Sequence, residues 1–250
     1  MKRILFFLMI LLLFTACGKV TVMTYNIHAM RGMDKVLDAT RIADVILSEK
    51  PDLVGLQEVD HLTARSGQFD AVSFFSEYTG MHAVYMKTFD YQGGAFGNMI
   101  LSRFPIVAQE EIRLPSREAY EVRLLMKVTV VTDRGDTLHF YNTHLDHHGE
   151  DSDRPAQMKK IVDVLSADSG KRIFLGDLNC EPGSEPIRML DGIMERCGPE
   201  EKTYPADLPE RIIDHIYIGP GSGLKCGTVR VVPETTASDH RPVVATLRLR

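Results

Sequence analysis

The sequence predicts an α+β protein in which two mixed β-sheets pack against each other and helices cover their outer faces. Strand-like segments outnumber helix-like segments, with about ten against about four, and such a set suits two packed sheets with helices outside. The 250 residues are 44% hydrophobic and 25% charged, which is ordinary for a globular protein. Because no internal repeat, low-complexity tract or long linker divides the sequence, we expect one domain.

The first 16 residues have the form of a signal peptide. Lys2 and Arg3 precede an apolar run at 4–14 that is too short to span a bilayer comfortably, and small residues then lead into Cys17. The run LFTAC resembles the lipobox of bacterial lipoproteins, whose Cys becomes the lipidated first residue. We therefore expect a signal peptide over 1–16, a domain over 17–250, and a chain anchored at the cell envelope through Cys17. A plain secretory signal with an incidental Cys is the alternative.

The first half of the chain alternates strands and helices. Residues 39–50 predict a helix because Ile42 and Ile46 fall on one helical face. Asp38 is the candidate N-cap of this helix, and Pro51 ends it. The other elements expected here are a strand at 20–27, a strand at 52–59, a short helix within 69–80 that ends at Gly80, and a strand at 81–89.

Strands dominate the rest of the chain. Residues 97–107 are interpreted as one strand, and residues 121–132 and 136–145 predict a hairpin around the turn at 133–135. An amphipathic helix is expected at 154–165, where a Pro stands in the first turn. Further strands are expected at 172–177, 211–219, 227–232 and 242–249.

Charge and cysteine content limit the function classes. The chain has 29 Lys and Arg against 34 Asp and Glu, and the signal peptide holds two of the positive charges, so the mature net charge is about −7. An acidic chain argues against non-specific binding of duplex nucleic acid, although a nuclease with a local basic cleft stays open. Three Cys remain after Cys17, so one Cys197–Cys226 bridge is an open alternative. The sequence contains no CxxC pair, so it gives no indication of a zinc site with thiolate ligands.

Polar side chains stand where the apolar strands end, as Asp177 and Asn179 do in IFLGDLN. Each has an ordinary alternative explanation, because Asp and Asn also cap turns. Together they have the chemistry of phosphoester hydrolysis: hard oxygen ligands suit Mg²⁺, and imidazoles with a further carboxylate serve acid–base roles. The residues in such positions are Asn26, Glu58, His144, Asp177, Asn179, Asp214, Asp239 and His240.

Seven short motifs along the chain resemble those of one superfamily. TYNIH, LQEVD, GNMILSR, NTHLD, GDLN, IDHIYI and SDHRPV occur in the order found in the endonuclease/exonuclease/phosphatase superfamily, and they cover nearly all of the mature chain. The resemblance implies a deoxyribonuclease I-like four-layer α/β/β/α sandwich. It also implies a metal-dependent phosphoester-hydrolysing site where the loops of the two sheets meet.

The resemblance further implies a role for each of these residues. Glu58 would be the principal Mg²⁺ ligand with Asn26 and Asp239 nearby, and Mn²⁺ is an alternative metal. Asp177 would orient or deprotonate the attacking water, and Asn179 would bind phosphoryl oxygens. The remaining implied roles are His240 on the scissile phosphate, Asp214 orienting His240, His144 as a second phosphate contact or general acid, Glu121 pairing with His144, and Asn98 touching substrate.

Two segments are candidates for substrate selection. The segment at 142–157 follows the motif His and offers Arg154 as a bidentate phosphate clamp, but it also suits a solvated loop before a helix. Arg65 follows Glu58 closely and is either a substrate contact or a surface residue. His28 stands where AP endonucleases carry an Asp, which weakens a role in DNA repair.

The leading functional hypothesis is a Mg²⁺-dependent phosphodiesterase or phosphatase acting on a small or lipid-linked phosphoester at the cell envelope. An extracellular metal-dependent nuclease is the alternative, and it would need a basic groove flanked by aromatic residues. A non-catalytic surface-binding lipoprotein is a third hypothesis, against which the intact site residues argue. We expect a monomer whose partners are a phosphoester substrate and the membrane, with nucleic acid not favoured.

Overall fold

The computed structural model describes residues 18–118, 120–149 and 152–249. The predicted signal peptide and the predicted lipidation site, Cys17, lie outside these residues. In the described part of the chain, no helix combines the length and apolar character needed to cross a membrane.

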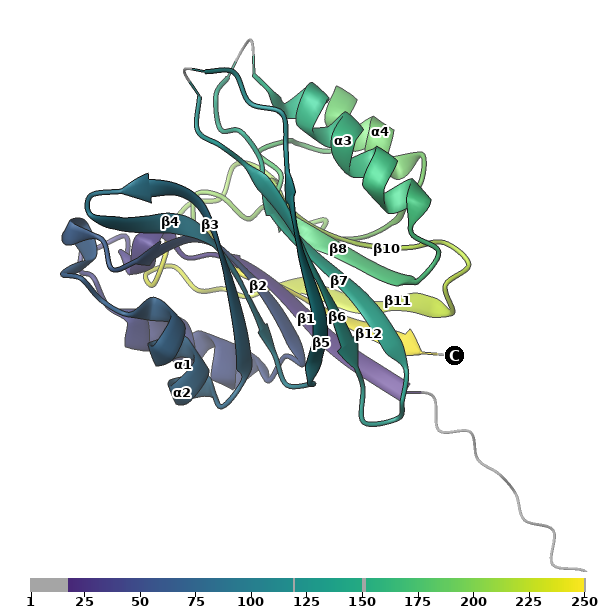
Figure 1. Ribbon diagram of the computed structural model, residues 1–250, viewed down its shortest axis with the longest axis horizontal. Helices are drawn as coiled ribbons and strands as arrows, with labels where there is room; N and C mark the ends of the chain where they lie inside the picture. Colours follow the sequence, from purple (N-terminus) through teal and green to yellow (C-terminus); the bar gives the residue numbers. More distant parts are fainter. Residues whose placement is uncertain (1–17, 119, 150–151, 250) are drawn as a thin grey trace, which may run out of the picture.

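Two six-stranded mixed sheets form the centre of the molecule (Figure 1). The first sheet has the order β11 (Leu224–Val231), β12 (Val243–Leu249), β1 (Gly18–Asn26), β2 (Leu53–His61), β4 (Gly94–Ser102) and β3 (His82–Tyr91). The second has the order β5 (Ile106–Arg113), β6 (Leu124–Val131), β7 (Thr137–His144), β8 (Lys171–Asp177), β10 (Asp214–Ile218) and β9 (Glu195–Gly198).

Four helices complete the layers. Helices α1 (Ala39–Glu49) and α2 (Ala71–Thr79) pack on the first sheet, and α3 (Arg154–Ala167) and α4 (Glu185–Asp191) pack on the second. Asp38 caps α1 by accepting from two backbone N–H groups, and Gly80 follows α2 with φ of +67°. Two short 3₁₀ helices, η1 (His28–Met30) and η2 (Ala64–Ser66), follow β1 and β2. The predicted four-layer α/β/β/α sandwich is confirmed.

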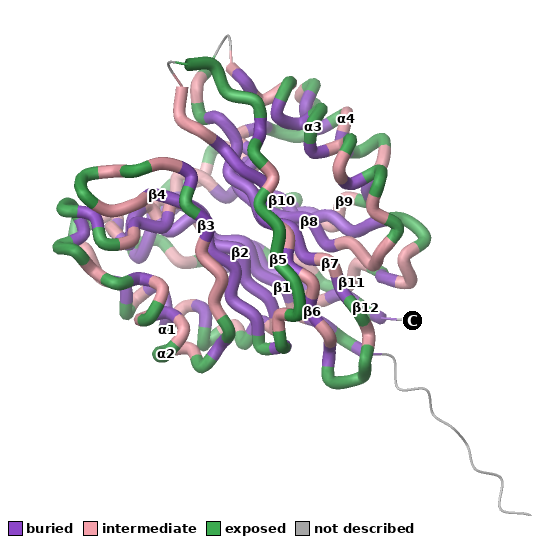
Figure 2. Tube along the Cα trace, viewed as in Figure 1, coloured by how far each residue is buried: buried purple, intermediate pink, exposed green. Residues whose placement is uncertain are grey.

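The core divides into three apolar clusters that match these layers. One lies between the two sheets, and the others lie between each sheet and its pair of helices. Figure 2 shows the central strands buried, while β5 at the edge of the second sheet is largely exposed. β2 and β4 are buried for most of their length because both of their faces are covered.

A parallel strand pair occupies the middle of each sheet and fixes where the polar strand ends meet. β1 pairs in parallel with β2, β7 pairs in parallel with β8, and the other pairings are antiparallel. The carboxyl ends of parallel strands lie at one edge, so the residues that end these four strands gather there. The strand order therefore brings together motifs that are far apart in the sequence.

Asn142 of β7 ties the two sheets together just below this edge. Its Nδ2 donates to the carbonyls of Leu56 and Met99 in the first sheet, both at 3.0 Å, and its Oδ1 accepts from Nε2 of Gln57 at 2.6 Å. Gly55 makes the close approach possible, because a Cβ there would lie 2.8 Å from Cγ of Asn142. A fully satisfied buried amide thus fixes the separation of the sheets under the site.

The structure corrects three of the sequence expectations. The strand expected at 97–107 is two strands in different sheets, because the chain leaves β4 at Ser102 and enters β5 at Ile106 after Pro105. Helix α4 and strand β9 were not expected; both are short, at seven and four residues. Such lengths carry little periodicity.

A disulfide joins the two sheets at their far edges. Cys197 in β9 is bonded to Cys226 in β11, with a Cα–Cα distance of 5.4 Å. β9 is an edge strand of the second sheet and β11 an edge strand of the first. The bridge that the sequence left open is therefore present, while Cys180 is buried and free.

Candidate active site

Polar side chains from both sheets meet at the carboxyl ends of the parallel strand pairs. Asn26, the last residue of β1, donates from Nδ2 to Oε1 of Glu58 at 3.0 Å and to Oδ2 of Asp177 at 2.9 Å. Asp177 ends β8 and lies in register with His144 of β7 on one side and Asp214 of β10 on the other. One amide therefore links a carboxylate of the first sheet to a carboxylate of the second.

Glu58 is presented by a β-bulge. The register between β2 and β4 shifts between Leu56 and Val59, and Glu58 has a φ of +55°. Non-glycine residues in this left-handed region are strained, and such strain is typical of functional sites. The bulge exposes Glu58 within a strand that is otherwise mostly buried, so its carboxylate lines a pocket.

The backbone around Asp177 is equally specialised. Gly176 has a φ of +150°, and a Cβ there would lie 2.0 Å from the carbonyl oxygen of Thr143. Asn179 has a φ of +48°, and its N–H donates to Oδ1 of Asp177 at 2.9 Å. The GDLN motif therefore needs its Gly for the close strand approach, and it holds the Asp177 side chain from its own loop.

His240 is held by two buried carboxylates. Its Nδ1 lies 3.0 Å from Oδ2 of Asp214, and its Nε2 lies 3.7 Å from Oδ2 of Asp177. Burial alone would lower the pKa of His240, but the carboxylates of Asp214 and Asp177 outweigh burial and raise this pKa to about 10. His240 is therefore a cation at neutral pH.

Asp177 can exchange a proton near neutral pH. Burial raises its pKa to about 7; the charge of His240 opposes this rise, and the carboxylate of Asp214 adds to it. A carboxylate of this kind is a competent acceptor for the proton of a water molecule.

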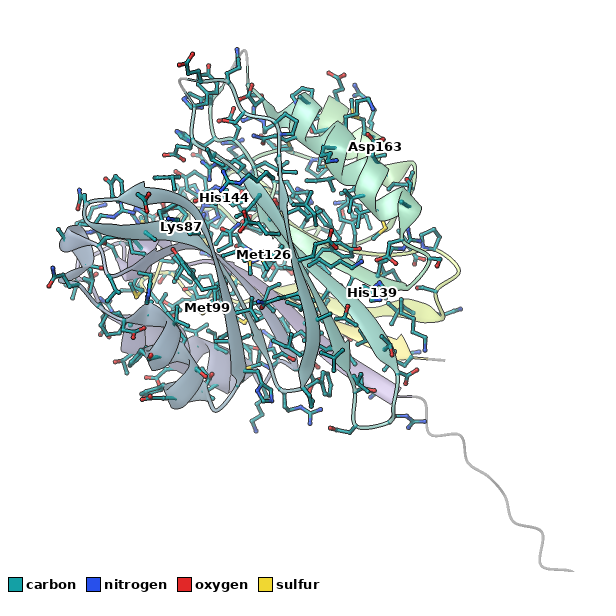
Figure 3. The ribbon with its side chains drawn as sticks, in the orientation of Figure 1. Lys87, Met99, Met126, His139, His144 and Asp163 are labelled. Carbon is teal, nitrogen blue, oxygen red and sulfur yellow. A yellow bond between two sulfur atoms is a disulfide. The ribbon has the colours of Figure 1, made fainter. Side chains whose placement is uncertain are left out.

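His144 is a neutral imidazole whose tautomer is set by an arginine. Burial, and secondly the charge of Arg123, hold the pKa of His144 well below its ordinary value. Nη1 of Arg123 lies 2.9 Å from Nδ1 of His144, and because guanidinium is only a donor, Nδ1 must accept. The ring proton is therefore on Nε2, which lies 3.5 Å from Oδ2 of Asp177 and 3.1 Å from Nδ2 of Asn179. Figure 3 shows His144 at the carboxyl end of β7 and His139 in its first half, and the site lies at the His144 end.

Asp239 and Tyr204 border the same centre. Oδ1 of Asp239 lies 3.7 Å from Nδ1 of His28, and Asp239 is partly exposed. The ring of Tyr204 lies 4.7 Å from the ring of His240, at 47°. Tyr204 comes from an irregular loop that the sequence motifs do not mark.

The structure gives each of the three predicted substrate residues partners or surroundings of its own, and their contact with substrate stays a prediction. The guanidinium of Arg154 donates to backbone carbonyls of the loop at 146–149, and Arg154 is not among the residues that line the pocket. Glu121 does not pair directly with His144; its Oε2 accepts from Nη2 of Arg123 at 2.6 Å. Asn98 is buried in β4, and its Nδ2 has no partner among the described residues.

The polar side chains that meet at this edge form a candidate catalytic cluster of Asn26, Glu58, His144, Asp177, Asn179, Asp214, Asp239 and His240. A pocket of about 250 Å³ opens beside it. Three aromatic residues from the β3–β4 hairpin, Phe89, Tyr91 and Phe96, form one part of its wall. Six polar residues complete the lining: Glu58, Arg65, Glu121, Arg123, His144 and His147. We call this cavity the aromatic pocket, and since Glu58 and His144 line it, it adjoins the catalytic cluster.

Comparison with known proteins identifies the family. The family model described as Endonuclease/Exonuclease/phosphatase family matches residues 23–240. The chain belongs to this family. Its members are metal-dependent phosphoric ester hydrolases, and the chain is an enzyme of that class.

Relatives and solved structures extend the match over nearly the whole chain. The uncharacterized protein YbhP of Escherichia coli (strain K12) is 25% identical over 251 residues, which cover 91% of this chain and 96% of that protein. The family structure from Beutenbergia cavernae has a TM-score of 0.73 at 24% identity and covers 92% of this chain and 72% of its own.

Two structures with named activities or functions share the fold. The mannosyl-6-phosphatase Bt3783 of Bacteroides thetaiotaomicron has a TM-score of 0.74 at 20% identity, over 91% of this chain and 99% of that chain. The human Nocturnin catalytic domain with bound sulfate has a TM-score of 0.73 at 20% identity, over 92% of this chain and 93% of that chain. At these identities the likeness shows a common fold.

The side chains of the site fit a divalent cation. Four carboxylates surround the centre, on Glu58, Asp177, Asp214 and Asp239. Burial, and to a smaller extent the carboxylate of Asp214, raises the pKa of Asp177. Carboxylate oxygens are the hard ligands that divalent cations such as Mg²⁺ prefer. Glu58 and Asp239 are the more accessible pair. The Oδ1 of Asn26 accepts from the N–H of His28 at 3.0 Å, so ligation of a metal by Asn26 stays a prediction.

Proposed function

We propose that the enzyme is a Mg²⁺-dependent phosphoesterase that hydrolyses a small phosphoester by attack of a water molecule on phosphorus. The observation that carries this proposal is the linked cluster in which Asn26 joins Glu58 to Asp177 and Asp214 holds the cationic His240. It combines a metal-binding carboxylate, a proton acceptor and a positive charge at one strand edge. These are the elements that phosphoester hydrolysis requires.

The side chains divide the reaction between them. A Mg²⁺ ion held by Glu58 and Asp239 would neutralise charge on the phosphoryl oxygens. Asp177 orients the water and accepts its proton, while the P–O bond to the leaving group breaks on the opposite side and the leaving oxygen takes up a proton from solvent. The cationic His240 stabilises the charge that develops on the phosphoryl group, and Asp214 keeps its ring in place.

His144 and Asn179 hold the other side of the phosphoryl group. The Nε2 proton of His144 points into the centre, so this neutral ring acts as a hydrogen-bond donor to a phosphoryl oxygen. Nδ2 of Asn179 lies 3.1 Å from this nitrogen and can donate to the same group. The neutral state of His144 makes it a donor contact rather than a general acid that gives up its proton.

Small substrates suit this site better than polynucleotides. The mature chain is acidic, whereas affinity for nucleic acid depends on Lys and Arg at the phosphates. The two arginines of the aromatic pocket are each paired, Arg65 with Asp60 and Arg123 with Glu121, so neither offers an unpaired charge. An extracellular nuclease is therefore the second candidate.

We also propose that the enzyme acts at the cell envelope through an anchor on Cys17. The Cys197–Cys226 disulfide supports export, because disulfides persist in oxidising compartments. The lipobox-like LFTAC supports the anchor itself. A phosphoester presented in or near the envelope is accordingly the expected substrate.

The test is a hydrolysis panel with purified residues 18–250 and Mg²⁺. The panel holds bis-p-nitrophenyl phosphate, p-nitrophenyl phosphate, plasmid DNA and RNA, each with wild type, His240→Ala and His82→Ala. His82 is an exposed histidine at the opposite end of β3 from the pocket and serves as the matched control.

We expect turnover of the small esters, a loss of two or more orders of magnitude in His240→Ala, and wild-type rates in His82→Ala. Cleavage of plasmid DNA at a comparable rate would favour the nuclease. Near-normal activity of His240→Ala would remove the proposed mechanism.

A further inference from the structure

We propose that the substrate carries its phosphoryl group on a neutral, hydroxyl-bearing ring of about monosaccharide size, and that the aromatic pocket binds this ring. The inference rests on the proposed function, because it names the substrate class of the same site. The pocket shares Glu58 and His144 with the catalytic cluster, so a group bound there would lie next to the reacting phosphate.

The first argument is the aromatic wall. Phe89 on β3 lies directly opposite Phe96 on β4, and their rings stack with centroids 5.1 Å apart. Tyr91 packs edge-on against Phe89 at 6.1 Å, and both residues are only half-buried. An aromatic face presents negative potential, which attracts the C–H groups on one face of a saturated ring.

The second argument is that the two arginines of the pocket are already paired with carboxylates. Arg65 binds the fully buried carboxylate of Asp60 through two hydrogen bonds of 2.5 and 2.7 Å. Arg123 binds Glu121 at 2.6 Å. A second phosphate or another anionic group on the ligand would find no unpaired cation among these pairs. A neutral polar group needs no cationic partner, so the pairing of the arginines does not disfavour its binding.

The third argument is the supply of hydrogen-bonding groups opposite the aromatic wall. Glu121 and His147 are both partly exposed, with side chains 40% and 54% accessible. Nε of Arg123 is buried and has no partner among the described residues, which is rare for a buried donor. Hydroxyl groups both donate and accept, so a polyhydroxylated ring can satisfy carboxylate, imidazole and guanidinium together.

The fourth argument is size. A pocket of about 250 Å³ lies below the range of about 300–1,000 Å³ that is typical for drug-sized ligands. It suits one ring rather than a nucleotide with both sugar and base. The six polar residues among nine lining residues also disfavour an acyl chain.

The experiment compares esters of primary alcohols, so that the leaving group is the same throughout. The probes are the 6-phosphates of glucose, mannose and galactose, glycerol 1-phosphate, 5′-AMP and a hexose 1,6-bisphosphate. Where the methyl phosphodiester of a probe can be made, it is tested as well. Bis-p-nitrophenyl phosphate reports whether the catalytic centre works at all. Wild type is compared with Tyr91→Leu, which keeps an apolar side chain without a ring, and with Tyr78→Leu on the exposed face of α2 as the matched control.

We expect at least one hexose 6-phosphate to exceed glycerol 1-phosphate and 5′-AMP in kcat/KM by about tenfold or more. Tyr91→Leu should reduce that ratio by about tenfold, and Tyr78→Leu should leave it unchanged. Binding of the free hexose to the metal-free protein, measured by saturation-transfer NMR, should weaken in Tyr91→Leu as well. The selectivity and the hexose binding of wild type are measured without any variant. They can therefore refute the inference even if Tyr91→Leu folds poorly.

The outcomes separate the two proposals. Turnover of bis-p-nitrophenyl phosphate without any preference for a hexose ester would overturn this inference and leave the proposed function standing. A preference for 5′-AMP or for the bisphosphate would also overturn it, because either ligand contradicts the size or the charge argument. Failure to hydrolyse every probe would instead contradict the proposed function.

Discussion

Removal of the Cys197–Cys226 disulfide should destabilise the protein strongly, because this bond joins the outer strands of two different sheets. The cysteines are 29 residues apart in sequence. In the chain-entropy account, closing a loop of this length stabilises the folded state by about 3.6 kcal/mol at 25 °C. For a chain of this size about 1 kcal/mol corresponds to about 2–4 °C in Tm, so the double variant Cys197→Ser/Cys226→Ser should melt about 7–14 °C lower.

The assay is thermal unfolding of residues 18–250, followed by circular dichroism with and without reductant. Wild type should lose stability in the reductant, whereas the double variant should show no further change, which makes it the control for non-specific effects of the reagent. A Tm within about 2 °C of wild type for the double variant would refute the reasoning. It would mean that packing alone holds β9 against β11.

Four further predictions follow from other parts of the molecule. Asn142→Ala should lower the free energy of unfolding by about 2–4 kcal/mol in a denaturant titration, because it leaves buried partners in the first sheet unsatisfied; an unchanged midpoint would contradict this. Although burial alone would raise the pKa of Asp168, hydrogen bonds led by that from Tyr141 hold it below its ordinary value, so Asp168 stabilises the fold above pH 3.8. The Tm difference between wild type and Asp168→Asn should accordingly shrink as the pH falls below 3.8, and a difference that grows there would be inconsistent. Arg123→Gln should lower kcat on the order of 10- to 100-fold by releasing the His144 ring, and wild-type turnover would exclude this positioning role. Cys17→Ser in the full-length chain should move the protein from the membrane fraction to the soluble fraction, and unchanged fractionation would count against the anchor.

Most of the fold follows from local patterns in the sequence. The helix over Ala39–Glu49 was predictable because its apolar spacing, its Asp38 cap and Pro51 agree with one another. The passage from β4 to β5 was not, because apolar residues stand on both sides of the short polar break at Ser102 and Arg103, and the segment therefore reads as one strand. Whether a strand pairs with one sheet or the other depends on long-range packing, which a local pattern does not record.

The gathering of the candidate catalytic residues at one strand edge was also largely predictable, for a different reason. These residues are polar groups at the ends of apolar strands, and such positions are conspicuous in a sequence. Arg123 was missed because a charged residue at the start of a strand looks like a solvated strand end, although it is only 2% exposed. The hairpin register gives the signal that could have found it: Leu125 pairs with Thr143, so Arg123, just before β6, lies beside the end of β7.

The hydrogen-bond partners of Arg154 were not predictable from the sequence. Its position after NTHLDHH made it a plausible phosphate clamp, but backbone carbonyls of its own loop occupy the guanidinium. The aromatic pocket was missed as well, because Phe89, Tyr91 and Phe96 alternate in β-strands as core residues do. Such side-chain contacts depend on the conformation of a loop or on how strands pair and sheets pack, and a single sequence records neither.

The most direct test of the central claim is the Mg²⁺ dependence of turnover of bis-p-nitrophenyl phosphate by wild type and Glu58→Gln after removal of metal with EDTA. The account predicts that EDTA abolishes the activity of wild type and that Mg²⁺ restores it. It also predicts that Glu58→Gln, which keeps the shape but loses the charge, needs a much higher Mg²⁺ concentration or stays inactive. Activity that is indifferent to chelation, or an identical Mg²⁺ dependence in the two proteins, would contradict the account.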